Sequence, residues 1–448
     1  MYYPFLFFVI LSPIPFGANR PWAWSLFAAL FALCGLVFFI QVLLGKRTLH
    51  LNFKGLLVSG FFWSITVGWI LIQTSSIAPD SWNHPFWKLA AEQLSTPVIG
   101  HISTNINQSY TALMRLISYA MVFILSLQFN RDTDKALLTF KALAYAGLAY
   151  ALYGIIVCVG QFDTILWFDK WAGNGVLTST FVNRNSYATY AGLGLLSVIP
   201  LLFKAFDSSL KYGLSSNFGR EYFYEHVLIK GWFPLLITFT LVCALLMSQS
   251  RGGALSTLLA IICLVIILLV SNKIHKKTGL LALVIATSII CWILFAKNVE
   301  VLMDRLDALD IESKGREAVY TLLSKVSSDN SELGLGYGTF ADSFRLYRDE
   351  TIVGFYDKAH NTYLENIFEL GYLQAVSLFL SIAWLALYCL RGVWVRKRNW
   401  IYPALGVAAS VLVGTHALVD FSLQIPAVAY TYALMMGAAV AQSTSTRK

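Results

Sequence analysis

Long apolar segments separated by short polar ones run through almost the whole chain. The length of these segments is close to the roughly 20 residues that a helix needs to cross a bilayer. We expect twelve membrane-spanning helices, at residues 2–17, 22–44, 55–73, 111–129, 136–159, 187–203, 231–248, 253–270, 279–297, 362–390, 402–418 and 426–441. The first segment lacks a basic stretch before it and a small-residue cleavage site after it, so we interpret it as a retained span. The pattern predicts an all-α polytopic membrane protein.

Composition and charge agree with this prediction. The 448 residues are 57% hydrophobic and only 13% charged, whereas about a quarter of the residues of a soluble domain are charged. Basic residues gather in the even-numbered connections: Lys46, Arg47, Lys54, Arg131, Lys135, Lys204, Lys211, Arg220, Lys230, Lys273, Lys276, Lys277, Arg391, Arg396, Lys397 and Arg398, with Arg447 and Lys448 at the end. Cytoplasmic loops carry such an excess, so we expect both termini in the cytoplasm. The net charge of +9 thus reports topology and does not indicate a nucleic-acid partner.

This topology divides the chain into three parts. We expect spans 1–9 within residues 1–297, one large, partly helical outer loop at 298–361, and spans 10–12 with a cytoplasmic C-terminus at 362–448. All six cysteines fall inside spans, and neither a CxxC motif nor a Cys/His cluster occurs. Disulfides and zinc sites are therefore not expected.

The conspicuous polar segments all fall on the outer side of this topology. They are GANRPW (17–22), TSTFVNRNSYA (178–188), SQSRGGAL (248–255), SKGREAVY (313–320), GLGYGTFADSFRLYR (334–348), KAHNTYLE (358–365) and HALVDFSLQIP (416–426). Ordinary loop residues would divide between the two sides. We therefore expect one outward-facing site, assembled from several helix ends.

Each segment also has an ordinary structural explanation. Arg251 could anchor its helix by reaching to the lipid headgroups, and the glycines after it could permit close helix packing. Arg184 could bind lipid phosphate non-specifically, while Asn185 or Ser186 could cap the helix that follows. These alternatives remain open at the level of sequence.

Three further motifs are interpreted as structural. GLGYGTF (334–340) follows no strand of a nucleotide-binding unit and is interpreted as a backbone turn. Asn361 suits a helix N-cap, and Glu365 suits the positive end of that helix. Asp132 and Asp134 are spaced like a metal-binding pair of sugar-nucleotide transferases. Their connection is short and cytoplasmic, however, so we expect them to end one helix and cap the next.

His360 is harder to explain as a structural residue. A histidine can accept a proton near neutral pH, and His360 precedes a helix at the expected water boundary. Arginine holds phosphate through two parallel hydrogen bonds and a permanent charge. Such residues together suit displacement at a carbon whose leaving group is a diphosphate, with the histidine taking the proton of the attacking hydroxyl.

The order of these motifs resembles the bacterial O-antigen ligase and polymerase superfamily, from about residue 13 to 430. The motifs are PIPFGANRPWAW, FVNRN, SQSRGG, GLGYGTF followed by FRLYR, AHNTYLENIFELG and HALVDFSLQIP. The resemblance implies a C-type, inverting, metal-independent glycosyltransferase that needs no cofactor. Such an enzyme transfers glycan from undecaprenyl diphosphate to a sugar hydroxyl on the periplasmic face of the bacterial inner membrane.

Carried over by motif, the resemblance assigns roles to individual residues. Arg184 and Arg251 would engage the diphosphate with help from Arg316. His360 would activate or orient the acceptor hydroxyl. Further candidates are Arg345 and Arg348 for acidic glycan or lipid headgroups, Asn361 and Asn185 as supporting residues, and Asp420 to position His360 or an arginine.

The glutamates of the tenth span, Glu365 and Glu369, stand one helical turn apart. Residues at this spacing share one helix face. We expect that face to be turned toward water or the arginines.

Members of this superfamily differ in their acceptor. A polymerase joins one lipid-linked repeat unit to another, whereas a ligase passes the finished polymer to lipid A-core. We favour a polymerase of O-antigen or exopolysaccharide repeats, with a ligase, a protein O-oligosaccharyltransferase and a lipid-linked glycan flippase as alternatives in that order. A flippase should carry charges near the bilayer midplane, and these spans are almost free of charge. Expected partners are the lipid-linked donor, a glycan or lipid A-core acceptor, membrane lipids and a chain-length regulator.

Overall fold

The computed structural model describes residues 1–50, 53–212, 231–276, 284, 302–350, 352 and 354–444. The ninth expected span, residues 279–297, lies outside the described residues apart from Val284. Within this part of the chain the fold is mostly helical. A single pair of two-residue strands, β1 (Thr164–Ile165) and β2 (Phe168–Asp169), forms an antiparallel hairpin.

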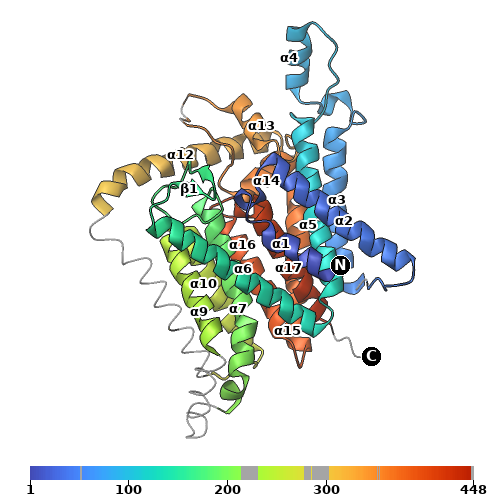
Figure 1. The fold of residues 1–448 in the computed structure, drawn as a ribbon. Helices are drawn as coiled ribbons and strands as arrows, with labels where there is room; N and C mark the ends of the chain where they lie inside the picture. Colours follow the sequence, from blue (N-terminus) through green and yellow to red (C-terminus); the bar gives the residue numbers. More distant parts are fainter. Residues whose placement is uncertain are drawn as a thin grey trace.

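The long apolar helices form one bundle (Figure 1). They are α1 (Tyr2–Leu11), α2 (Pro21–Leu43), α3 (Phe53–Thr74), α5 (Ile106–Phe129), α6 (Thr133–Val159), α7 (Arg184–Tyr212), α9 (Trp232–Met247), α10 (Arg251–Val270), α15 (Tyr372–Val395), α16 (Ile401–His416) and α17 (Pro426–Gln442). Seven helices of the described part are long and apolar enough to cross a membrane: α2, α3, α5, α6, α7, α10 and α15. The chain is a multi-pass membrane protein.

Helix α17 lies at the centre of the bundle. Every one of its residues is buried, and it packs against α5, α16 and α7 on different sides. Small side chains allow this: a Cβ added at Gly437 would collide with Ser126 and the backbone of Phe123 on α5. A helix without lipid contact does not need a strongly apolar surface, which explains why α17 carries polar and small residues.

The outer domain gathers at one end of the bundle (Figure 1). It contains α12 (Leu302–Asp329), α13 (Phe340–Tyr347) and α14 (Thr362–Leu370), with α4 (Pro85–Leu94) projecting beyond them. A separate apolar core joins these helices through Leu323, Phe340, Phe344 and Phe368. The prediction of a partly helical loop in this region is confirmed.

Two expected spans differ from the observed helices. Helix α1 ends at Leu11, well before residue 17, because Pro13 and Pro15 cannot donate the hydrogen bonds that would continue it. The tenth span, 362–390, is two helices: Gly371 adopts φ +82° between α14 and α15. A Cβ at Gly371 would meet the carbonyl of Glu332, so this break fits glycine alone. Helix α14 consequently belongs to the outer domain.

The candidate spans also carry more charge than expected. Arg115 lies within α5 and Lys141 within α6. The ammonium of Lys141 lies 5.4 Å from the ring of Tyr145, a neighbour on the same helix. Arg115 lies over Trp24 of α2, and its environment is described further below.

Candidate functional site

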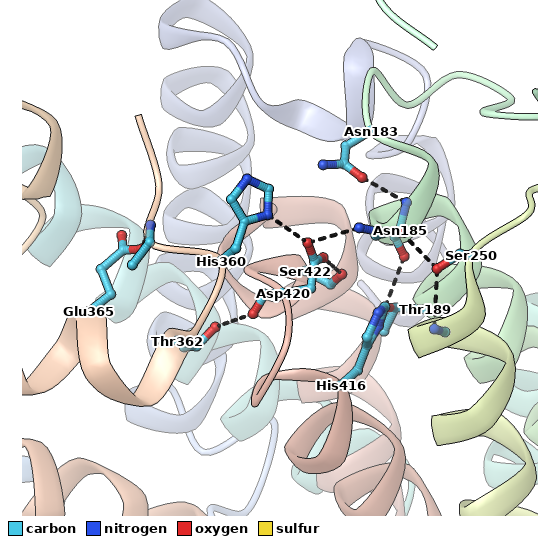
Figure 2. A network of polar contacts seen from close by, with 12 residues as sticks. Asn183, Asn185, Thr189, Ser250, His360, Thr362, Glu365, His416, Asp420 and Ser422 are labelled. Carbon is cyan, nitrogen blue, oxygen red and sulfur yellow. Dashed lines mark hydrogen bonds and ion pairs between the residues drawn. The ribbon is translucent and has the colours of Figure 1, made fainter. Parts of the chain in front are cut away.

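A buried polar network joins four helix ends at the base of the outer domain (Figure 2). It connects the first turns of α7, α10 and α14 with the loop between α16 and α17, which contains the short 3-10 helix η4 (Ser422–Gln424). These segments are far apart in sequence. They meet because α7, α10, α16 and α17 pack against one another in the bundle.

Asp420 is the centre of this network and is fully buried. Its Oδ1 accepts a hydrogen bond from Asn185 Nδ2 at 3.2 Å, and its Oδ2 accepts one from the Ser422 hydroxyl. Burial by itself would raise the pKa of Asp420. The contacts with His360 and Ser422 and the nearby His416 outweigh burial, so the pKa lies below the ordinary value. Asp420 is therefore ionised at neutral pH, although it is buried.

His360 faces Asp420 across a short gap (Figure 2). Its Nδ1 lies 3.5 Å from Asp420 Oδ1, longer than an ordinary hydrogen bond of about 2.7–3.2 Å. Nδ1 is buried and has no closer acceptor among the described residues. The imidazole side chain remains 24% exposed, and its other nitrogen points away from Asp420. The ring thus has one buried edge next to an anion and one edge open to a substrate.

The backbone around His360 holds the ring in this place. His360 adopts φ +55°, a conformation that costs a non-glycine residue free energy and that the surrounding structure must stabilise. Its carbonyl accepts a hydrogen bond from the Tyr320 hydroxyl at 3.0 Å. Its ring packs edge-on against Phe421, with centroids 4.9 Å apart. The next residue, Asn361, caps α14 by accepting from the amides of Tyr363 and Leu364, which confirms its predicted capping role.

Two side chains connect the starts of α7 and α10. Ser250 caps α10 by accepting from the Gly253 amide, and its hydroxyl donates to Asn185 Oδ1 at 2.8 Å. This bond orients the Asn185 amide so that its NH₂ group faces Asp420. The alternative in which Asn185 or Ser186 caps α7 does not hold, because Asn183 accepts from the Asn185 amide at 2.7 Å instead.

Arg184 and Arg251 are the first residues of α7 and α10, and both are exposed. Each is adjacent in sequence to a member of the network, Asn185 and Ser250 respectively. No ion pair involving either arginine is found among the described residues. The positive ends of two helices, each of which begins with an exposed arginine, therefore lie at the network that contains the His360–Asp420 pair, an arrangement suited to a polyvalent anion.

Residues 236–379 match a family model described as O-antigen ligase. This match supports the predicted resemblance to the O-antigen ligase and polymerase superfamily. No curated protein matches the chain. The matched segment contains Arg251 and His360, whereas Arg184, Asn185 and Asp420 lie outside it.

Two of the remaining predicted arginines, Arg345 and Arg348, do not join the network. Arg316 lies on α12, and its side chain falls outside the described residues. The guanidinium of Arg345 lies 5.1 Å from the ring of Phe355. Arg348 donates to the carbonyl of Gly354 at 2.7 Å. Arg345 and Arg348 thus hold the loop that follows α13.

The expectation that Glu365 and Glu369 face water or the arginines is wrong, because both are buried within the outer domain. Glu365 accepts from the Lys358 ammonium at 3.2 Å and from the Ala359 amide at 2.8 Å. It therefore fixes the segment that leads to His360. Glu369 accepts from the Phe340 amide at 2.9 Å.

The GLGYGTF segment (334–340) has a structural role in the backbone, as predicted. The amides of Leu335 and Gly336 donate to carbonyls of α14, and the amide of Tyr337 donates to the Gln73 side chain. Its amides are thus used inside the protein, not arranged around a phosphate. The interpretation of Asp132 is likewise confirmed, because its carboxylate accepts from the Asp134 amide and caps α6.

We expect the stability of the protein to depend on pH because the carboxyl group of Glu369 is buried. Burial, together with the charge of Glu365, raises the pKa of Glu369 from 4.5 to about 7. Because folding favours the protonated form, the free energy of unfolding should be highest below pH 4.5 and decrease as the pH rises to about 7. The decrease amounts to at most about 3 kcal/mol.

Thermal unfolding in detergent would measure this effect. Glu369→Gln should remove most of the decrease between pH 5 and 7.5, since the amide resembles the protonated acid. Glu332→Gln, at an exposed position, should keep the wild-type pH dependence. Equal slopes for the two variants would contradict the assignment to Glu369.

The site residues predicted from the sequence did not include Thr189, His416 or Ser422 of this network. His416 Nδ1 and the Thr189 hydroxyl share a hydrogen bond of 2.6 Å. The Ser422 hydroxyl donates to Asp420. The glycines after Arg251 allow the close packing considered above, because a Cβ at Gly252 would lie 3.1 Å from His416 Nε2. His416 belongs to the HALVD motif, and a polar residue at the end of an apolar span is the sequence feature that could have identified it as a member of the site.

Proposed function

We propose that the protein is a glycosyltransferase that moves glycan from undecaprenyl diphosphate to a sugar hydroxyl, and that it acts as a polymerase of lipid-linked repeat units. The observation that supports this proposal most directly is the position of the His360–Asp420 pair next to the starts of α7 and α10, which carry Arg184 and Arg251. The match of residues 236–379 to the O-antigen ligase family model supports the class of reaction. The site would face the periplasm, and both termini would lie in the cytoplasm.

The proposed reaction is a single displacement that requires no metal and inverts the anomeric centre. The acceptor hydroxyl oxygen attacks the anomeric carbon of the donor from the face opposite the diphosphate. A new C–O bond forms as the bond from carbon to the diphosphate oxygen breaks, and the electron pair leaves with the diphosphate. The hydroxyl proton passes to the open nitrogen of His360.

Each part of the network has a role in this reaction. Asp420 faces Nδ1 of His360, which favours the tautomer whose outer nitrogen can accept a proton, and it stabilises the imidazolium that forms. Arg184 and Arg251, with the helix ends that they begin, would neutralise the negative charge that develops on the leaving diphosphate. Asn185 and Ser250 connect the starts of α7 and α10 with Asp420. They would therefore keep the position of His360 fixed relative to the diphosphate site.

The glycan profile of a strain that lacks the protein tests the acceptor. If the protein is a polymerase, lipid-linked and core-linked glycan should stop at single repeat units. Expression of the wild-type chain should restore the long polymer. Long polymer that remains on the polyprenyl carrier, with bare lipid A-core, would instead show a ligase and would overturn the polymerase assignment.

A further inference from the structure

Arg115 is an arginine inside a candidate membrane span that lacks a charge partner. It lies in the first half of α5, and its guanidinium is 4.9 Å from the ring of Trp24 on α2. Its Nε is buried without a hydrogen-bond partner, and no carboxylate forms an ion pair with it in the described part of the chain. Ionisable side chains within a bilayer are costly and usually mark a functional position. Such a charge needs an anion.

An apolar groove is lined by the neighbours of this arginine on α5, Met114 and Ser118 among them. It lies between α2 and α5 and has a volume of about 470 Å³, a size typical of small-molecule sites. Ala28, Ala29 and Ala32 form one wall, while Met114, Ile117 and Met121 form the other. The alanines leave space between the two helices, and methionine side chains adapt readily to a hydrocarbon chain.

Arg115 and Trp24 flank the groove, because they are adjacent in sequence to its lining residues Met114 and Ser25. Helices α2 and α5 both start on the side of the outer domain, and Trp24 precedes the groove-lining residues of α2 in sequence. The charge of Arg115 is also within electrostatic reach of Tyr337, in the loop that supports α14. A molecule in this place would have its hydrocarbon in the outer leaflet and an anionic group at Arg115.

The groove and the His360–Asp420 pair lie on either side of the start of α17. Tyr430 of α17 hydrogen-bonds Ser118, a residue of the groove, at 3.0 Å. The α16–α17 loop that precedes this helix carries Asp420, which faces α7 and α10. Arg184 and Arg251 therefore belong to one side of α17, and Arg115 belongs to the other.

We infer that the α2–α5 groove binds a second polyprenyl diphosphate, the lipid anchor of the acceptor, with its diphosphate on Arg115. This inference rests on the proposed polymerase function, because only a polymerase has a lipid diphosphate on both substrates. The first would be bound at Arg184 and Arg251, and the second at Arg115. The non-reducing end of the acceptor glycan would then reach His360 from the side opposite the donor.

Native mass spectrometry of the full chain in nanodiscs of zwitterionic lipid tests this inference, with undecaprenyl diphosphate as the probe. The wild type should bind two copies. Arg115→Gln should weaken binding of one copy by about tenfold or more, because a charge-assisted contact is lost. Ala32→Phe should have the same effect by filling the groove from an exposed position.

Matched controls separate these effects from general damage. Lys141→Gln removes a positive charge from the neighbouring candidate span α6, and Leu33→Phe enlarges the exposed neighbour of Ala32. Both variants should bind two copies. One bound copy in the wild type, or two undiminished copies in Arg115→Gln, would overturn the inference. Displacement of the second copy by excess phosphatidylglycerol would assign the groove to ordinary phospholipid and would also overturn it.

A transfer assay on the same samples distinguishes failure of this inference from failure of the proposed function. Two copies bound without any transfer of lipid-linked sugar would leave the groove site standing and reject the polymerase. Transfer that is unaffected by Arg115→Gln at limiting acceptor would reject the groove site and leave the polymerase standing.

Discussion

His360→Ala should reduce glycan transfer by about 10²–10⁴-fold, the contribution usual for a general base. The imidazole has one nitrogen buried beside ionised Asp420 and the other open to the acceptor. Alanine removes the proton acceptor, and no other described side chain in the network can replace it: His416 is 1% exposed and bonded to Thr189. The measurement is the rate of glycan transfer by purified protein with a lipid-linked donor.

Two comparisons make this test specific. His50→Ala changes an exposed histidine on the expected cytoplasmic side and should leave the rate unchanged. The double variant His360→Ala, Asp420→Asn should lose little more than His360→Ala, because Asp420 acts through the imidazole and such effects are not additive. Losses that multiply, or a His360→Ala rate within threefold of wild type, would contradict the proposed base.

The second large effect concerns the arginines at the starts of α7 and α10. Arg251→Ala and Arg184→Ala should each reduce the rate by about 10²–10³-fold, comparable to loss of one donor to a developing anion. Lysine at either position should recover part of the rate, since it restores the charge but not the two parallel hydrogen bonds. The effect should fall mainly on the rate constant at saturating acceptor, because the charge develops as the diphosphate leaves.

Arginines elsewhere provide the reference for this test. Arg391 is exposed near the opposite end of α15, and Arg391→Ala should transfer glycan at the wild-type rate. Arg345→Ala should have an effect of less than about tenfold, because its guanidinium already contacts Phe355 within the outer domain. A larger loss for Arg345→Ala than for Arg251→Ala would move the diphosphate site to the outer domain.

The residue types of the site could be predicted from the sequence, whereas their connections could not. Arg184, Arg251 and His360 stand in polar motifs at the ends of apolar segments, so topology alone predicts that they lie on the same side. The bond from Ser250 to Asn185 and the position of Asn185 next to Asp420 depend on how α7, α10 and the α16–α17 loop pack. A hydropathy pattern contains no information about which helices are neighbours.

For Glu365 and Glu369, too, the sequence predicts the local geometry but not the surroundings. Their spacing correctly predicts a shared helix face, because helical periodicity is local. The surroundings of that face depend on α13 and on the glycine loop before it, which fold over α14 and supply backbone amides to Glu369. What looked like a wet or catalytic face is therefore a structural contact of the outer domain.

The sequence by itself determined that this chain is a multi-pass membrane protein and where most of its apolar helices lie. These properties follow from local hydropathy. Only the tertiary structure decided that α17 is the buried centre, that the tenth span is broken at Gly371, and that Arg115 Nε is buried without a hydrogen-bond partner among the described residues. Those features arise from contacts between residues distant in sequence, where side-chain shape and burial determine which polar groups meet.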